Sequence, residues 1–384
     1  MTTYRLMHKN VIAAIVVFED ETPTDITVVN IEQMPVGAVF RYKQVVKCDI
    51  MTFRRWWSNR VVPSSRTGVQ RLLKANNVKT VGNYALQNLG LSLTDCYWLC
   101  PINVALSWEH VNFFVNICTT LRIGASVCTP DSTLSGNMPK YWRNSNGVYY
   151  LYKQADNIQR AYNEIFALQV HMTQAKRLMQ DVVPYTVQQI GQQMYTVCPN
   201  ICTGTVELIH ATDLLNSTKC FDNQTTYVTL KPLLQKYGLT EEYIDNYFDY
   251  MLMFDFVISN IDRHMKNIAV LRNADTLQVY ALAPLYDNGD SMFVNGLENV
   301  TEHELLAQET SSFYKRAVDN LKLVRNRSAF NIQAAPKAQL IESVYKGCTC
   351  LNTQQIETMT RLYNMKLNYL WRFQRGENIW NLVR

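Results

Sequence analysis

Apolar positions in the first part of the chain gather in short runs that predict strands and short helices. Val11–Phe18 is a continuous apolar run that ends at acidic residues, and a run of this length is typical of a buried strand. Ile26–Ile31 predicts a second strand, and Val69–Ala75 predicts a short helix. Phe53–Arg60 is rich in tryptophan and arginine. We interpret its aromatic side chains as part of a packed core and not as a surface for stacking bases.

From residue 121 onward the pattern becomes one of strands around a single long helix. A loop rich in Gly, Ser, Thr and Pro spans Gly124–Pro139 and precedes a predicted strand at Val148–Lys153. Apolar side chains at helical spacing then predict a helix over Asp156–Met179. Two further strands are predicted at Gln193–Cys198 and Val206–Ile209.

The last part of the chain has a mainly helical pattern. Glu241–Ile258 places apolar residues along one helical face. Ile268–Leu271 and Leu277–Leu282 predict a β-hairpin, and Glu302–Arg384 has the pattern of several amphipathic helices. Because strands and helices segregate along the chain, we predict an α+β protein with a β-rich N-terminal lobe and a mainly helical C-terminal lobe.

Length and composition predict a globular protein with more than one core. The 384 residues exceed the usual size of a single hydrophobic core. A content of 47% hydrophobic and 18% charged residues is typical of a folded chain and excludes a disordered one. We predict an N-terminal α/β subdomain over 1–115, a β-rich lobe over 116–215 and a helical lobe over 216–384.

Charge and cysteine content narrow the possible functions. A net charge of +5 suits a phosphate-bearing ligand, but it is too weak and dispersed to indicate nucleic-acid binding. No apolar run reaches the roughly 18 residues needed to cross a bilayer, so we expect no membrane association. The ten cysteines include no C-x-x-C pair, which argues against a zinc site. We expect reduced, mostly buried thiols in a cytoplasmic protein.

The segment that carries the most chemical information contains Asp262 and Asn267, five residues apart, with Asp287 twenty residues after Asn267. Phosphoryl transfer requires a carboxylate that orients the attacking hydroxyl and accepts its proton. It also requires oxygen ligands that hold Mg²⁺ against the phosphates. Asp262 and Asn267 reproduce the spacing of a kinase catalytic loop. A long apolar helix, a hairpin and Asp287 accompany this pair in order. The alternative is that Asp262 caps a turn and that His264 is a structural histidine.

The sequence here resembles a known family. Asp262–Asn267, read as Asp-Arg-His-Met-Lys-Asn, and Ala283–Asp287 look like the catalytic and metal loops of HipA-type Ser/Thr protein kinases. The same string is similar to the phosphatidylinositol kinases. The resemblance implies a two-lobed protein-kinase-like fold that uses ATP and Mg²⁺.

The resemblance also implies a role for each residue of the two loops. Asp262 would act as the catalytic base, and Asn267 and Asp287 would hold Mg²⁺. His264 and Lys266 would stabilise charge on the transferring phosphoryl group.

The resemblance extends upstream into the β-rich lobe. Ser135 and Gly136, followed by Lys140, look like the family's phosphate-binding loop, in which backbone N–H groups contact phosphate oxygens. Lys153 matches the strand lysine that contacts the α- and β-phosphates. Glu164, which follows an asparagine on the long helix, would form an ion pair with Lys153. The alternatives are an exposed lysine at a strand end and a solvated helical carboxylate.

Two further assignments follow from the resemblance. Glu207 and Ile209 occupy the place of the strand that reads the adenine edge through its backbone. In the family, a hydroxyl in the phosphate loop undergoes autophosphorylation, which switches the kinase off. Thr133 and Ser135 are the candidates in this chain.

Three functions fit these observations. The first is an active HipA-like kinase that phosphorylates a protein Ser or Thr, of the toxin type that pairs with a small DNA-binding antitoxin. The second is a nucleotide-binding pseudokinase that acts as an interaction module. The third is a kinase for a lipid or small molecule. The complete set of metal ligands favours an enzyme, and the absence of a basic amphipathic helix disfavours a lipid substrate.

Overall fold

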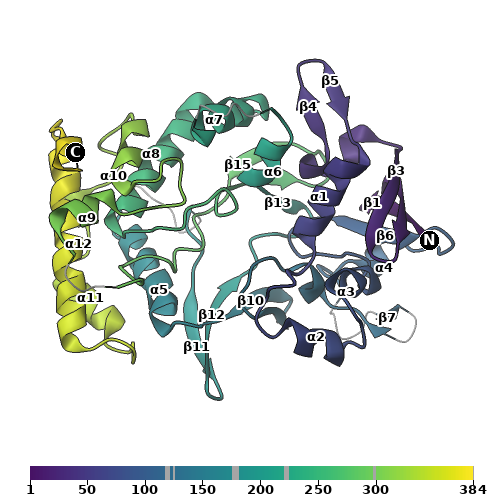
Figure 1. The fold of residues 1–384 in the computed structure, drawn as a ribbon, viewed down its shortest axis with the longest axis horizontal. Coiled ribbons are helices and arrows are strands. Elements are labelled where there is room, and N and C mark those ends of the chain that lie inside the picture. Colours follow the sequence, from purple (N-terminus) through teal and green to yellow (C-terminus); the bar gives the residue numbers. More distant parts are fainter. Residues whose placement is uncertain (117–121, 124–125, 175–180, 220–224, 297–299, 384) are drawn as a thin grey trace. The chain divides into compact units, whose positions relative to one another are not determined.

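The structure is a computed structural model that describes residues 1–116, 122–123, 126–174, 181–219, 225–296 and 300–383. The chain forms two compact units, each assembled from separate stretches of sequence (Figure 1). The first unit comprises Met1–Gln154, Pro199–Asp222 and Leu271–Val279. The second unit comprises Ala155–Cys198, Asn223–Val270 and Tyr280–Arg384. The division into 1–115, 116–215 and 216–384 stays a prediction.

An antiparallel sheet of order β3-β2-β1-β6 opens the first unit. Its strands are β1 (Thr2–His8), β2 (Val11–Glu19), β3 (Thr22–Val28) and β6 (Tyr97–Pro101). The first predicted strand is confirmed as β2. The prediction of the second strand, Ile26–Ile31, was wrong at its C-terminal end, because β3 stops before Asn30. The Asn30 side chain accepts the backbone N–H of Glu32 and so caps a 3-10 turn where the strand was expected to continue.

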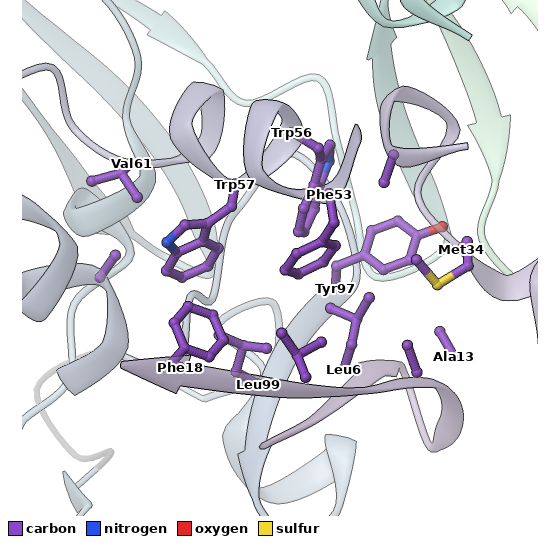
Figure 2. Close-up of a cluster of buried hydrophobic side chains, with 14 of the residues drawn as sticks. Leu6, Ala13, Phe18, Met34, Phe53, Trp56, Trp57, Val61, Tyr97 and Leu99 are labelled. Carbon is purple, nitrogen blue, oxygen red and sulfur yellow. The ribbon is translucent and has the colours of Figure 1, made fainter. Parts of the chain in front are cut away.

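Helix α1 (Ile50–Arg60) covers one face of this sheet. Figure 2 shows the side chains of Phe53 and Trp57 directed toward Phe18 and Leu99 of the strands. The rings of Phe18 and Trp57 meet edge to face at 5.4 Å between centroids. The tryptophans of α1 are therefore core residues, as the composition of this segment predicted.

The other strands of the first unit form hairpins. β4 (Phe40–Tyr42) pairs with β5 (Val45–Lys47), β7 (Arg122–Ile123) with β8 (Ser126–Val127), and β9 (Lys140–Ser145) with β10 (Val148–Gln154). The unit also holds β13 (Val206–His210), α2 (Val69–Ala75), α3 (Val81–Gln87), α4 (Trp108–Val111) and α6 (Ala211–Asn216). The predictions of α2, β10 and β13 are thereby confirmed.

The second unit is mainly helical, as predicted. Helix α5 (Ile158–Met172) is shorter than the predicted helix Asp156–Met179, and residues 175–180 lie outside the described part of the chain. Helix α8 packs against α12, and α5 packs against α11 (Figure 1). The helices are α7 (Thr226–Lys236), α8 (Glu241–Val257), α9 (Glu302–Ala307), α10 (Ala317–Asn320), α11 (Ala338–Tyr345) and α12 (Thr353–Gln374).

Two further hairpins follow α5 in the sequence. They are formed by β11 (Thr186–Ile190) with β12 (Gln193–Pro199), and by β14 (Ala269–Asn273) with β15 (Val279–Leu282). The α+β prediction, with strands mainly toward the N-terminus and helices mainly toward the C-terminus, is confirmed. Within the described residues no helix combines the length and apolarity needed to cross a bilayer, and the eight cysteines placed there are free thiols.

Candidate active site

The predicted catalytic loop, residues 260–267, follows directly from the buried helix α8. Nearly every residue of α8 from Phe248 to Val257 is buried, so the end of this helix is fixed in the core of the second unit. Asn260 then joins the helix to the loop. Its Nδ2 donates to Asp255 Oδ1 at 2.9 Å, and its Oδ1 accepts the N–H of Asp262 at 3.0 Å. The position of Asp262 is thus set by a hydrogen-bonded connection to α8.

Arg263 connects the catalytic loop to the predicted metal loop, residues 283–291. Its guanidinium is fully buried and donates to both carboxylate oxygens of Asp255 at 2.9 Å. It also donates to Asn288 Oδ1 at 2.6 Å and to the carbonyl of Tyr286 at 2.7 Å. Burial lowers the pKa of Arg263, but the charge of Asp255 outweighs burial and leaves that pKa above its usual value. The planar, permanently charged guanidinium of arginine can donate to all of these acceptors at once.

Asp262 is half-exposed and has polar neighbours on two sides. Its Oδ1 accepts a hydrogen bond from Ser311 Oγ at 3.0 Å, and its Oδ2 lies 3.8 Å from His264 Nε2. Desolvation raises the pKa of Asp262, and the carboxylates of Asp290 and Asp287 raise it further, whereas His264 and Ser311 lower it. The negative charges of Asp287 and Asp290 thus act on Asp262. A site of this kind accepts a proton readily and attracts a cation.

Asn267 and Asp287 present oxygen atoms on the two loops. Asn267 is buried and its Nδ2 donates to the carbonyl of Asp262 at 2.8 Å, so its Oδ1 is left as the acceptor of the amide. Asp287 has a φ of +58°, a left-handed conformation that aspartate tolerates better than most residues. Its N–H donates to Tyr185 Oη at 3.3 Å.

The donor set fits magnesium. Mg²⁺ binds proteins through one or two carboxylate or carbonyl oxygens and keeps several waters. Asn267 and Asp287 provide oxygen donors of this kind, and the negative charges of Asp287 and Asp290 raise the pKa of Asp262. Within the described residues no group of three or more His, Cys, Asp or Glu side chains forms a metal cluster.

The other two predicted catalytic residues lie in the same loop. His264 is partly exposed, and its Nδ1 accepts the backbone N–H of Lys266 at 3.2 Å. The Lys266 side chain is exposed, and the backbone carbonyl of Lys266 accepts a hydrogen bond from Tyr286 Oη at 2.7 Å. The second unit thereby brings together five predicted site residues, namely Asp262, His264, Lys266, Asn267 and Asp287.

Glu164 and its neighbour Asn163 hold the metal loop from helix α5. The buried Glu164 accepts the backbone N–H of Asn288 at 3.0 Å and its side-chain amide at 3.3 Å. Asn163 Nδ2 donates to the carbonyls of Gly289 and Ser291 at 2.8 and 2.7 Å. The sequence predicted an ion pair between Glu164 and Lys153. These two residues belong to different units, and the ion pair stays a prediction.

The predicted phosphate loop, residues 133–140, belongs to the first unit. Ser135 and Gly136 are exposed, and Gly136 has a φ of +86°. A Cβ added to Gly136 would lie 2.8 Å from Lys140 Nζ, so the lysine amine sits beside this glycine. Lys140 is directly opposite Lys153 in the register of β9 and β10. The two lysines therefore bring two positive charges to the same part of the hairpin.

Glu207 and Ile209 lie on β13, where the adenine-reading strand was predicted. The Glu207 side chain is fully buried within the first unit. It accepts hydrogen bonds from Arg272 at 2.6 and 2.9 Å and from the N–H of Cys96 at 2.7 Å, and it lies 3.0 Å from His8 Nε2. Burial raises the pKa of Glu207, but these partners lower it more, to about 2. The side chain is thus a structural ion-pair partner. The reading of adenine by the backbone of β13 stays a prediction.

Sequence reasoning missed several residues that position this site. Asp255 is a single acid inside an apolar helical run, and a buried charge implies a buried partner. That pattern alone could have indicated a partner such as Arg263, which adjoins the predicted base. Ser311 carries no comparable signal, because it lies 49 residues from Asp262 in a loop of unremarkable composition.

Comparisons with known proteins identify part of this chain. A comparison with curated proteins found no significant match. Among solved structures, the crystal structure of the Helicobacter pylori proinflammatory kinase CtkA is similar, with a TM-score of 0.45 and 13% identity, over 62% of this chain and 94% of that chain. Residues 203–348, which include the catalytic and metal loops, match the family described as HipA-like C-terminal domain. The match confirms the resemblance of residues 203–348 to the HipA-like kinases and supports a phosphotransferase.

Proposed function

We propose that this chain is an ATP- and Mg²⁺-dependent kinase that phosphorylates a serine or threonine hydroxyl of a protein. The observation that carries the proposal is the arrangement of Asp262, Asn267 and Asp287 on two loops that Arg263 joins. A base and two metal ligands are the groups that phosphoryl transfer requires of a protein. Here the two loops are held by buried and partly buried hydrogen bonds.

Each residue has a role in the proposed reaction. Asp262 orients the acceptor hydroxyl and takes its proton as the hydroxyl oxygen bonds to the γ-phosphorus. The bond from that phosphorus to the β–γ bridging oxygen breaks, and ADP leaves. Asn267 and Asp287 hold the metal through their oxygens. When bound, Mg²⁺ supplies positive charge that offsets the negative charge of the phosphates.

The residues that we propose for contact with the phosphates belong to the first unit. The exposed backbone of Ser135 and Gly136 would contact phosphate oxygens, and Lys140 beside it would supply charge. Lys153, in register with Lys140, would contact the α- and β-phosphates.

The experiment that tests the substrate class uses γ-labelled ATP with Mg²⁺ and three acceptors: the chain itself, a cell lysate and a lipid extract. The proposal expects label on protein, confined to phosphoserine and phosphothreonine and lost in Asp262→Asn. Label in the lipid extract alone would replace the protein acceptor by a lipid. Equal labelling by the native chain and Asp262→Asn would leave only a nucleotide-binding module.

A toxin-type role, with a small DNA-binding antitoxin as partner, remains a proposal that rests on the family resemblance alone. Phosphoproteomics of cells that express either the native chain or Asp287→Ala identifies the target. A phosphorylated component of translation, found only with the native chain, would support this role. Unchanged growth and an unchanged phosphoproteome would contradict it.

A further inference from the structure

The segment just before α2 holds the phosphate loop through hydrogen bonds. Within the first unit, Arg66 donates from Nε to the carbonyl of Gly136 at 3.0 Å and from Nη2 to the carbonyl of Ser135 at 3.1 Å. Nη2 also donates to the carbonyl of Leu134. The N–H of Thr67 donates to the carbonyl of Asn137 at 3.1 Å. Four successive carbonyls of the loop are therefore bound by two adjacent residues of the N-terminal region.

These hydrogen bonds determine the direction in which the N–H groups of the loop point. A peptide unit is planar, and its C=O and N–H point in opposite directions. Because the carbonyls of residues 134–136 point toward Arg66, the N–H groups of Ser135, Gly136 and Asn137 point away from it. These three residues are exposed. None of their N–H groups donates a hydrogen bond to the described part of the chain.

Gly136 lies in the middle of this row of N–H groups. Its φ of +86° is a left-handed conformation, which occurs in backbone nests that bind anions. A residue with a Cβ at this position would have a strained backbone. The loop therefore presents three N–H groups on the side opposite to Arg66.

Arg66 is suited to maintain this shape. It is 5% exposed, so its guanidinium is held away from water by the surrounding protein. The planar fork reaches three carbonyls at once, whereas a lysine ammonium is a single point donor. The loop is also attached at its start, where Thr133 Oγ1 donates to the carbonyl of Leu91 at 3.0 Å.

We infer that Arg66 is a positioning residue that holds the phosphate loop in the shape that receives the phosphates of ATP, which makes the N-terminal region part of the nucleotide site. The inference rests on the proposed function. Arg66 itself lies on the far side of the loop from the N–H groups. It therefore acts through the backbone and not by touching the phosphates.

The test compares the native chain with Arg66→Met and Arg66→Lys, with Arg71→Met as the matched control. Arg71 is an exposed arginine on α2. Affinities for ATP with Mg²⁺ and for adenosine are measured by calorimetry, and hydrogen exchange of residues 132–140 is measured without nucleotide. We expect Arg66→Met to weaken ATP binding about tenfold, to leave adenosine affinity unchanged and to speed exchange across the loop. The ATP affinity and loop exchange of Arg66→Lys should lie between those of the native chain and of Arg66→Met. Those of Arg71→Met should match the native chain.

The two readouts separate this inference from the proposed function. Unchanged ATP affinity and unchanged loop exchange in a folded Arg66→Met, or in Arg66→Lys if that variant unfolds, would overturn the role of Arg66. Equal losses of ATP and adenosine affinity would also overturn it, because they indicate general damage. A native chain that binds no ATP would overturn the proposed function. Even then, faster loop exchange in Arg66→Met would show that Arg66 holds the loop.

Discussion

Ser311 Oγ donates a hydrogen bond to Asp262 Oδ1 at 3.0 Å, and the N–H of the same serine donates to the carbonyl of Ile261 at 2.9 Å. One residue thus fixes both the backbone and the carboxylate of the proposed base. Because a hydrogen bond to a carboxylate favours its ionised form, Ser311 lowers the pKa of Asp262 and opposes the rise caused by desolvation.

Ser311→Ala should therefore change the pH dependence of phosphoryl transfer. Without the hydroxyl, the pKa of Asp262 rises further, and the acid limb of the kcat profile moves to higher pH. Ser311→Thr should restore the native profile. Ser312→Ala is the matched control, because no described partner binds its Oγ. An acid limb that stays in place in Ser311→Ala would show that this hydrogen bond does not tune the base.

Arg263→Met should strongly destabilise the second unit. The substitution leaves Asp255 buried without its ion-pair partner, and loss of one partner of a buried pair typically costs about 3–5 kcal/mol. Arg325→Met is the control: its ion pairs with Glu241 and Asp245 are exposed, and loss of exposed pairs costs about 1 kcal/mol or less. Urea unfolding measures both. Equal, small effects would contradict the account of Arg263 as the connection between the loops.

Lys366 should make stability depend on pH. This residue of α12 is fully buried, its Nζ lies 4.4 Å from the centroid of Phe256, and no described group accepts a hydrogen bond from it. Burial lowers its pKa from 10.5 to about 7. Between these values the unfolded chain binds the proton and the folded chain does not, so the free energy of unfolding should rise with pH.

Lys366→Met should be more stable than the native chain near neutral pH, by an amount on the order of a few kcal/mol. It should also lack the native rise in stability above pH 7. Lys346→Met, at an exposed lysine, provides the comparison. Thermal unfolding from pH 6 to pH 10 measures these effects. Parallel curves for all three proteins would show that Lys366 does not titrate in this range.

Autophosphorylation, if the loop undergoes it, should occur on Ser135. Ser135 is exposed, whereas Thr133 Oγ1 donates to the carbonyls of Leu91 and Pro130 at 3.0 and 3.3 Å. Ser135→Ala should therefore remove the loop phosphate from the mass spectrum, and Thr133→Ala should retain it. Phosphate on Thr133 in the native chain would contradict this assignment.

Local patterns predicted the elements that surround the site, and long-range contacts account for what they did not predict. The apolar face of α8, the hairpin of β14 and β15 and the Asp-x-x-x-x-Asn spacing are all readable within a few residues. The hydrogen bond from Arg66 to Gly136 joins residues 70 positions apart, and the buried Glu207 has partners in β1, in β14 and at Cys96 just before β6. No period or motif encodes pairings at such separations. The end of β3 was missed for a local reason, because a single asparagine cap outweighed a weak strand pattern.

The most direct test of the central claim is the rate of phosphate transfer from γ-labelled ATP by the native chain, Asp262→Asn and Asp287→Ala, each with and without Mg²⁺. The account predicts transfer that requires Mg²⁺ in the native chain. It predicts a rate at least about 100-fold lower in Asp262→Asn, and a rate without magnesium dependence in Asp287→Ala. Equal rates in all three proteins, or native transfer that is indifferent to Mg²⁺, would contradict it.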